Sequence, residues 1–187
     1  MRPRLENIKI AVEGFKELKN DIDGVNDWFE TSGIANEDEY DMILDVSEMG
    51  KMAVKLWNRR GNILVEESDK KDLIIQMVQL LVEAQSVDVD PIDWIELMSP
   101  VCSFKSTVVD ATEVKYCVDW IKGCVKQKCD KMLIATTSEN ISFFEINNEV
   151  IELLDETGLV DDIYWCDIEP SIWAYKEDKL KVSIWYR

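Results

Sequence analysis

Residues 101–136, VCSFKSTVVDATEVKYCVDWIKGCVKQKCDKMLIAT, decide the fold that the sequence predicts. Residues 101–109 are strand-like, and residues 110–129 begin with two acids at the spacing of a helix capping pair, so we expect a helix there. Residues 132–136 are a short apolar run, typical of a buried strand. This strand–helix–strand order permits one parallel crossover in a sheet.

The rest of the C-terminal half predicts further strands and one more helix. We expect a helix over 148–157, before Gly158, and strands over 163–168, 171–176 and 180–186, with 141–146 as a further candidate strand. In the last strand, apolar residues alternate with Lys181, Ser183 and Trp185, which is typical of a half-buried strand. Glu177-Asp178 is the expected hairpin turn before it, so the sheet should be mixed.

The N-terminal half reads as mostly helical. Apolar residues at three- and four-residue steps predict a helix over about 5–24, and a longer one runs from the N-cap Asn36 to Gly61. The apolar stripe of this longer helix is Met42, Val46, Met49, Ala53 and Leu56. Two more helices are expected over 69–85, apolar on most sides, and over 90–98.

These elements predict an α+β fold, with a helical N-terminal half packed against a mixed β-sheet formed by the C-terminal half. We expect a single domain over residues 1–187, with a helical subregion over about 1–99 and an α/β subregion over about 100–187. A chain of this length can bury a sizeable core without metals or disulfides.

The distribution of charge is the strongest indication of function. The formal net charge is −17 at pH 7, and the chain has no histidine. Acids occur without any Lys or Arg in three segments: ten between Lys19 and Lys51, six between Lys71 and Lys105, and ten between Lys131 and Lys176. A protein with this excess of negative charge repels nucleic acid and anionic membranes, so we expect neither as a direct partner.

Much catalytic chemistry is excluded by residue type. Without histidine, Ser-His-Asp and Cys-His systems and His-based zinc sites cannot form within this chain. No phosphate-binding glycine motif is present, so no cofactor is predicted. The number of cysteines is odd, five, and no two of them form a Cys-x-x-Cys pair. This pattern favours free thiols in a reducing compartment, so we expect a cytoplasmic protein.

Three remaining candidates for chemistry have simpler explanations. The spacing of Cys117, Cys124 and Cys129 indicates small hydrophobic side chains buried in the core, in preference to a metal or redox site. The triplet 177–179, with Asp162 and Asp167 before it, superficially matches a nuclease magnesium motif, but acids around it oppose a polyanionic substrate. A general acid–base carboxylate pair cannot be singled out among 38 acids. We therefore predict no catalytic and no metal-binding residues, and no enzyme.

Two acidic stripes are the candidate partner-binding surface. On the expected helices, Glu37, Asp41, Asp45 and Glu48 would share one face, and Glu149, Glu152 and Glu156 would share another. Ordinary solvated helix faces are the alternative interpretation. The complete candidate set is Asp21, Asp23, Asp27, Glu30, Glu37, Asp41, Asp45, Glu48, Glu149, Glu152, Glu156, Asp161 and Asp162.

We therefore expect a non-enzymatic, acidic binding protein whose partner is a basic protein, especially one that handles nucleic acid. The preferred form is a nucleic-acid mimic that inhibits a nuclease by occupying its basic surface, of the anti-CRISPR or anti-restriction type. An immunity protein against a nuclease toxin, an acidic adaptor or structural subunit, and a carboxylate-dependent metal hydrolase are the alternatives. The sequence leaves the oligomeric state open.

Overall fold

The computed structural model describes residues 9–14, 29–32, 38–82, 91–110, 114–137, 143–167 and 179–187. These residues form a mixed nine-stranded sheet in the order β2-β1-β3-β4-β5-β6-β9-β7-β8. The elements are, in chain order, β1 (Ile10–Glu13), β2 (Phe29–Ser32), β3 (Met42–Asp45), β4 (Lys51–Leu56), β5 (Arg59–Leu64), the 3₁₀ helix η2 (Glu67–Asp69), α2 (Lys70–Val82), α3 (Pro91–Leu97), β6 (Cys102–Asp110), α4 (Val114–Cys124), β7 (Cys129–Thr137), α5 (Phe143–Asp155), β8 (Val160–Asp167) and β9 (Lys179–Tyr186).

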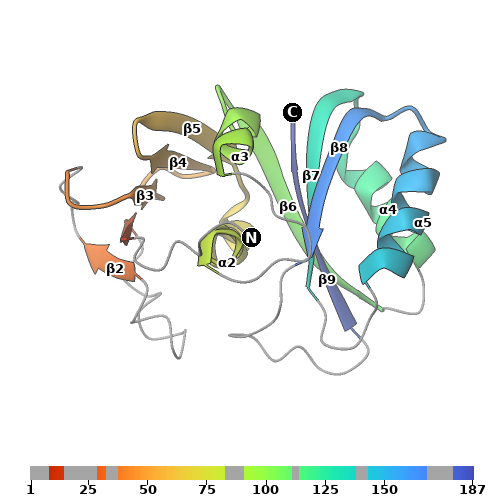
Figure 1. Cartoon of the computed structure of the whole chain (residues 1–187), viewed down its shortest axis with the longest axis horizontal. Coiled ribbons are helices and arrows are strands. Elements are labelled where there is room, and N and C mark those ends of the chain that lie inside the picture. Colours follow the sequence, from red (N-terminus) through yellow and green to blue (C-terminus); the bar gives the residue numbers. More distant parts are fainter. Residues whose placement is uncertain are drawn as a thin grey trace.

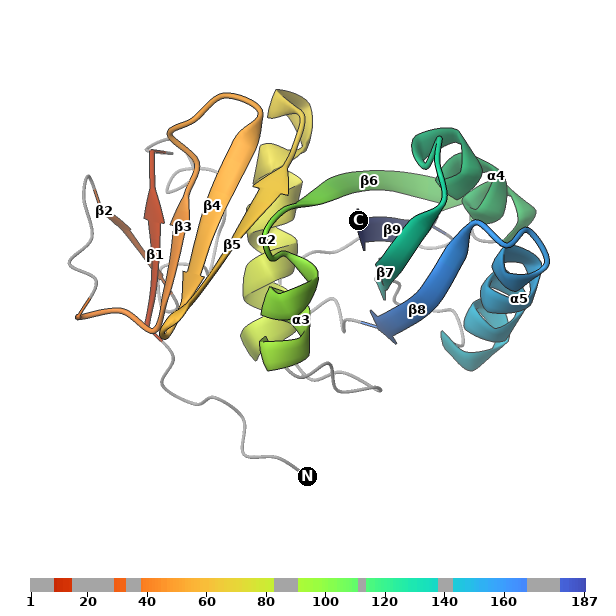
Figure 2. The same cartoon turned by 90° about the horizontal axis from the view of Figure 1, so that it is seen from above.

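The elements are arranged in layers along the long axis of the molecule. Strands β1 to β5 lie at one end, and α2 and α3 lie between them and strands β6 to β9 (Figure 1). Helices α4 and α5 cover the opposite face of the C-terminal strands, at the other end of the molecule (Figure 2). The two views agree that α2 is enclosed between the two halves of the sheet.

The prediction of a helical N-terminal half is wrong, because this half supplies five of the nine strands. The region expected as one helix over 36–61 contains β3, β4 and the start of β5. Met49, placed on the expected apolar stripe, is 86% exposed in the turn between β3 and β4. In β4, buried Met52, Val54 and Leu56 alternate with partly exposed residues, which is the period of a strand.

The predictions from residue 69 onward fare better, with two corrections. Helices α2, α3 and α4 and strands β6, β7, β8 and β9 lie where they were expected. Residues 143–146 belong to α5 and not to a strand, and the expected strand 171–176 and turn 177–178 fall outside the described residues. The crossover joins β6 to β7, but β9 lies between them, antiparallel to both.

Strand β9 is buried on both faces, which corrects the expectation of a half-buried strand. Lys181, Ser183 and Trp185 are as enclosed as the apolar residues between them, because α2 and α3 cover one face and α4 and α5 the other. Trp185 packs on Phe104 with ring centroids 4.9 Å apart. It also meets Trp94 of α3 edge-on, at 6.4 Å and an interplanar angle of 86°.

A buried ion pair joins α2 to the middle of the C-terminal strands. Lys181 Nζ lies 2.7 Å from Asp72 Oδ1, and the lysine side chain is 3% exposed against 40% for the aspartate. Ser106 Oγ donates a hydrogen bond of 3.0 Å to Asp72 Oδ2. The carboxylate therefore binds two strands, β9 and β6, to the first turn of α2.

Gly61 of β5 allows α3 to pack directly on the sheet, and we predict that Gly61→Ala destabilises the fold. A Cβ atom there would lie 2.8 Å from Met98 Cβ and 3.1 Å from the Met98 carbonyl oxygen. The same carbonyl accepts a 3.1 Å hydrogen bond from the Asn62 N–H, so a shift of Met98 away from the new methyl group would weaken this hydrogen bond. Overpacking of this kind costs about 1–3 kcal/mol, which urea unfolding followed by tryptophan fluorescence would detect.

Gly123→Ala is the matched control for this substitution. Gly123 lies within α4, and a Cβ atom there would meet nothing within 4 Å. Alanine is the better helix former, so we expect a gain of roughly 0.5 kcal/mol. Equal urea midpoints for the two variants would contradict the close approach of α3 to β5.

We also predict that Asp72→Asn destabilises the protein by about 3 kcal/mol, because it removes the carboxylate charge beside a buried ammonium group. Glu96→Gln is the control, since Glu96 and Arg59 form an ion pair of the same length, 2.7 Å, with both side chains substantially exposed. The control should lose less than ~1 kcal/mol in the same urea titration. Equal losses would show that burial of Lys181 does not set the strength of its ion pair.

Candidate functional site

Helix α5 carries one of the two predicted acidic stripes. Glu149 and Glu152 within α5, and Glu156 just beyond its end, are exposed, whereas Val150 and Leu154 are buried against the core. The spacing of three and four residues places the glutamates on the outer side of the helix. Within the described part of the chain, none of these three glutamates takes part in an ion pair. The stripe therefore has the form that the sequence predicts.

Strand β8, which follows α5 in the chain, carries two more of the predicted acids. Asp161 and Asp162 are both exposed at the start of β8. Asp161 Oδ1 lies 2.5 Å from Lys128 Nζ, an exposed ion pair. Asp162 stands beside Lys131 in the parallel register with β7, and Lys131 Nζ lies 5.9 Å from the centre of the Tyr164 ring. We call Glu149, Glu152, Glu156, Asp161 and Asp162 the acidic end.

The second predicted stripe does not exist as a helix face, because its residues surround strand β3. Asp41 precedes β3, and its Oδ2 accepts a 2.9 Å hydrogen bond from the Lys9 N–H. At the other end of β3, Asp45 Oδ1 accepts hydrogen bonds from the Ser47 N–H and hydroxyl, at 2.9 and 2.6 Å. These carboxylates are therefore used to fix strand ends.

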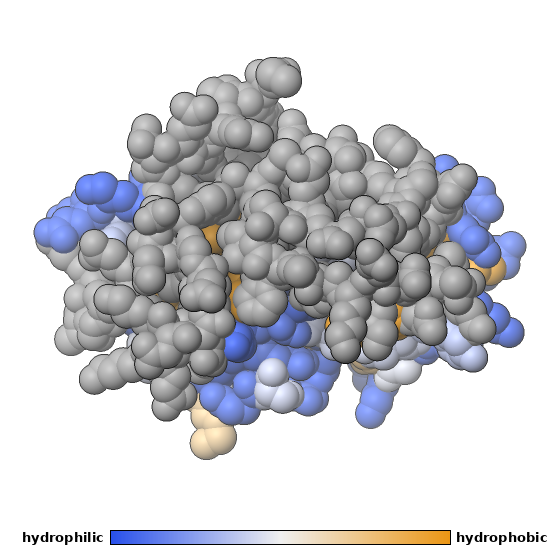
Figure 3. Space-filling model, turned by 90° about the horizontal axis from the view of Figure 1, so that it is seen from below, coloured by the Kyte–Doolittle hydropathy of each residue, from blue (hydrophilic) through white to orange (hydrophobic). Residues whose placement is uncertain are grey.

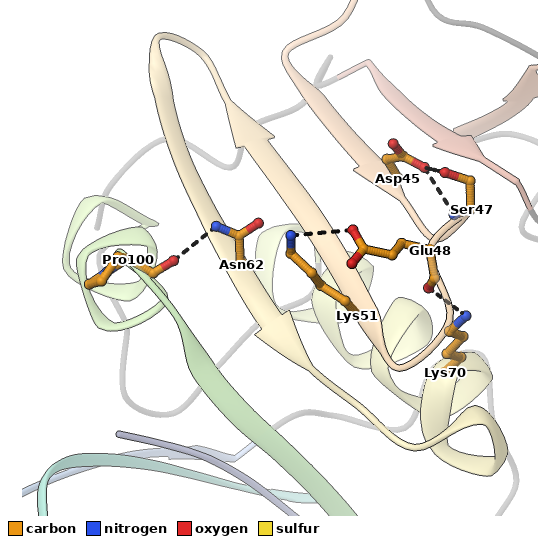
Figure 4. A network of polar contacts seen from close by, with 7 residues as sticks. All are labelled: Asp45, Ser47, Glu48, Lys51, Asn62, Lys70 and Pro100. Carbon is orange, nitrogen blue, oxygen red and sulfur yellow. Dashed lines mark hydrogen bonds and ion pairs between the residues drawn. The ribbon is translucent and has the colours of Figure 1, made fainter.

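Glu48 serves the turn between β3 and β4 in the same way (Figure 4). Its carboxylate lies 3.3 Å from Lys51 Nζ, and its carbonyl oxygen accepts a 3.1 Å hydrogen bond from Lys70 Nζ. Lys70 is 3% exposed and also donates to the Val46 carbonyl at 3.2 Å. This turn is thus attached to the first residue of α2.

The remaining candidates cannot be joined to either group. Asp21, Asp23, Asp27 and Glu37 lie outside the described residues, and Glu30 pairs with Ala11 in register between β2 and β1. Strand β3 is the third strand from one edge of the sheet, whereas β8 forms the other edge. Figures 1 and 2 place β3 and α5 at opposite ends of the molecule, so the two groups do not converge. The acidic end is therefore the candidate surface that remains among the described residues.

Three features of this surface were not predicted from the sequence. Tyr164 is 43% exposed on β8, although its strand reads as apolar. The position of β8 at the sheet edge is set by long-range pairing, for which the sequence carries no local signal. Asp155 of α5 is also exposed beside the stripe. In the space-filling view, the end of the molecule that carries α4 and α5 is mainly hydrophilic (Figure 3).

The other candidates for chemistry give no site. Among the described residues, no three Cys, Asp or Glu side chains lie close enough together to hold a metal ion, and Glu177 of the possible nuclease motif lies outside them. Thr137 Oγ1 and Ser183 Oγ, also within the described ranges, have no hydrogen-bond partner. They are enclosed in the sheet near Lys181, at 1% and 0% exposure, with no surface to offer a ligand.

The cysteines behave as small core residues. None of the five forms a disulfide, and all but Cys124 are buried. Burial raises the pKa of Cys102 to about 12 and that of Cys117 to about 11. Because the thiolate is the reactive form, these two groups are poor nucleophiles and poor metal ligands near neutral pH.

Comparison with known proteins identifies a fold and no family. No family model matches the chain, and no curated protein matches it. The structure is similar to FtsZ of M. jannaschii, solved as an empty dimer, with a TM-score of 0.50 and 15% identity over 64% of this chain and 38% of that one. A tryptophan-to-tyrosine mutant of the same FtsZ matches with a TM-score of 0.50 and 14% sequence identity, over 64% of this chain and 39% of the mutant's chain. The chain thus spans under two fifths of FtsZ, and the likeness concerns the fold alone.

The described helices are all too short or too polar to cross a membrane.

We predict that the thiols react in the order set by their burial. In native protein at pH 8, Ellman's reagent should modify the partly exposed Cys124 first and the buried Cys102 far more slowly. With its pKa raised to about 12, Cys102 holds a thiolate fraction of roughly 10⁻⁴ at that pH. Its rate should rise about tenfold for each pH unit toward pH 10, because its pKa lies above this range. In guanidinium chloride all five thiols should react alike, and fast modification of Cys102 in native protein would contradict its burial.

Proposed function

We propose that this chain is a non-enzymatic binding protein that docks on a basic protein through its acidic end. One observation supports this choice of surface. The acids around β3 are engaged in hydrogen bonds and an ion pair that hold strand ends and a turn, whereas Glu149, Glu152, Glu156 and Asp162 have no ion pair within the described residues. These four charges remain available to a partner.

The arrangement of these charges carries an energetic cost when the protein is alone. Glu152 and Glu156 are one helical step apart, and like charges at this spacing destabilise a helix by a few tenths of a kcal/mol. A surface shaped only by solubility would mix Lys with Glu and gain from their pairing. Cations supplied by a partner would remove the repulsion, and the attraction would accelerate association at low salt.

Among basic proteins, those that handle nucleic acid present the most extended positive surfaces. We therefore propose an inhibitor that occupies the basic surface of a nuclease, of the anti-CRISPR or anti-restriction type. An immunity protein would bind a nuclease toxin through the same charges, and an adaptor would bind without changing its partner's activity. The activity of the bound partner separates these three forms.

The triple variant Glu149→Gln/Glu152→Gln/Glu156→Gln should bind the partner about tenfold more weakly than the wild type, since three exposed charge pairs contribute ~0.5 kcal/mol each. Basic proteins captured from source cells by the immobilised full chain are purified and titrated by calorimetry. The difference should shrink as the salt concentration rises from 0.05 to 0.5 M, because salt screens exposed charges.

The control variant removes three exposed acids that lie outside the acidic end, one in the turn between β3 and β4 and two on α3: Glu48→Gln/Asp93→Asn/Glu96→Gln. It has the same net charge as the triple variant, so it should keep nearly wild-type affinity if the acidic end is the binding surface. If both variants lost the same affinity for the partner, the loss would come from the change in net charge and not from the position of the acids. Failure of every captured protein to distinguish the two variants would overturn the proposed function.

A further inference from the structure

Helices α4 and α5 pack side by side on one face of the C-terminal strands, and their outer sides carry opposite charge. The two helices contact each other, and none of the other described elements covers their outer sides (Figures 1 and 2). The outer side of α5 is acidic, because Glu149, Glu152 and Glu156 are exposed there. We call the exposed side chains of residues 115–126 and 148–156, taken together, the α4–α5 face.

The outer side of α4 is basic, although the chain as a whole has a net charge of −17. Lys115 and Lys122 are exposed and seven residues apart, which places them on the same face of the helix. Lys126, just beyond the end of α4, is also exposed. Within the described residues, none of these three lysines takes part in an ion pair. The outer side of α4 is therefore positive overall, even with the exposed Asp119 between Lys115 and Lys122.

The two helices point in the same direction, which fixes how a second copy can meet them. Strands β6 and β7 both run antiparallel to β9, and β8 is parallel to β7, so β6, β7 and β8 share one direction. Helix α4 returns from β6 to β7, and α5 returns from β7 to β8. A two-fold axis parallel to these helices would place α4 of each copy over α5 of the other, and would close the assembly at two copies.

The spacing of the charges suits this arrangement. Glu149 and Glu156 are seven residues apart, as Lys115 and Lys122 are, and seven residues span roughly 10 Å of helix. Glu156 keeps the helical spacing, because its N–H donates a 3.1 Å hydrogen bond to the Glu152 carbonyl. Two lysines of one copy can thus face two glutamates of the other, and the two-fold axis repeats the same pairs on the opposite side.

An exposed aromatic side chain accompanies these charges. Tyr116, in the first turn of α4, is 56% exposed next to Lys115. Aromatic side chains surrounded by polar groups are frequent anchors of protein interfaces. The α4–α5 face therefore offers apolar area as well as charge to a second copy.

The overall negative charge of the chain opposes association at long range, whereas the facing charges attract at contact. At ~0.15 M salt the Debye length is about 8 Å, so charges separated by more than this distance are largely screened. Two copies that meet through α5 alone would bring glutamates together. Pairing of α4 with α5 brings opposite charges together, so local charge decides which faces meet.

We propose that the α4–α5 face is an interface between two copies of this chain, in which α4 of each copy lies over α5 of the other. This inference stands apart from the proposed function, because the interface needs no other protein. A basic partner and a second copy would compete for Glu149, Glu152 and Glu156. The dimer would then be the state in which these acids are neutralised while the partner is absent.

The test exchanges charges between the two helices of the full chain. The first variant, Lys115→Glu/Lys122→Glu, places acids on both helices, and the second, Glu149→Lys/Glu156→Lys, places lysines at the facing positions of both. The wild type, each variant and their equimolar mixture are measured by sedimentation equilibrium at ~0.15 M salt. Far-ultraviolet circular dichroism checks that every variant is folded.

The wild type should form a dimer with a dissociation constant on the order of 100 µM, because two short helices make a small interface. Each charge-reversed variant alone should remain monomeric, since like charges then face each other. Their mixture should form a heterodimer with about the wild-type affinity. The milder variant Lys115→Gln/Lys122→Gln should dimerise about tenfold more weakly, because it only removes exposed ion pairs.

The matched control is Asp93→Lys/Glu96→Lys, which reverses two exposed acids of α3 and has the same net charge as the second variant. It should dimerise as the wild type does, and it should not restore wild-type affinity when mixed with the first variant. Loss of its dimer to the same degree as in the second variant would overturn the interface. A wild type that stays monomeric at millimolar concentration, or a mixture of the reversed variants without heterodimer, would also overturn it. These outcomes leave the proposed function standing, because none of them involves a partner protein.

Discussion

The first turn of α2 holds the two halves of the sheet together. Strands β5 and β6 share only two register pairs, so backbone hydrogen bonds alone join the halves weakly. Lys70, the first residue of α2, donates to two carbonyls in the turn between β3 and β4. Two residues later, Asp72 binds Lys181 and Ser106 of the C-terminal strands. The following apolar residues Leu73, Ile74 and Met77 are fully enclosed.

This central position of α2 explains the rest of the layered arrangement. One core cluster includes side chains from β1, β3, β4 and β5, from α2 and α3, and from all four C-terminal strands. A second cluster lies under α4 and α5, on the opposite face of β7, β8 and β9. Lys181, on the face of β9 that α2 covers, is tolerated in the core because the Asp72 carboxylate, itself bound by the Ser106 hydroxyl, lies against its ammonium group. The acidic end lies beyond both clusters, so its charges can serve a partner without disturbing the core.

The sequence predicts the elements whose own period is unambiguous. Helix α2 is apolar on most sides and begins after an acid, and α3 begins with proline at its first position, so both were predicted. The region 36–61 was not, because Met42, Val46, Ala53 and Leu56 satisfy a helical period by coincidence while β4 alternates with period two. A two-residue turn closes this hairpin with Trp57 at a φ of +51°, a conformation that a bulky residue seldom adopts and that turn statistics therefore miss.

The candidate site was also predictable only in part. The stripe on α5 follows from helical spacing and is present, whereas the stripe around β3 disappeared with the helix that would have carried it. The position of β8 in the sheet depends on the strand order β9-β7-β8, which long-range pairing decides. Local pattern therefore indicates which side chains are charged and exposed, and topology determines which of them share a surface.

The edge-to-face contact between Trp94 and Trp185 has a spectroscopic consequence. Trp94 lies on α3, which packs against β5, and Trp185 lies on β9 in the C-terminal strands. Two indoles this close couple electronically, so their near-ultraviolet circular dichroism depends on the docking of the two halves. If the halves separated with their secondary structure intact, this signal would disappear while the far-ultraviolet spectrum persisted. The protein thus carries an intrinsic optical reporter of its own internal assembly.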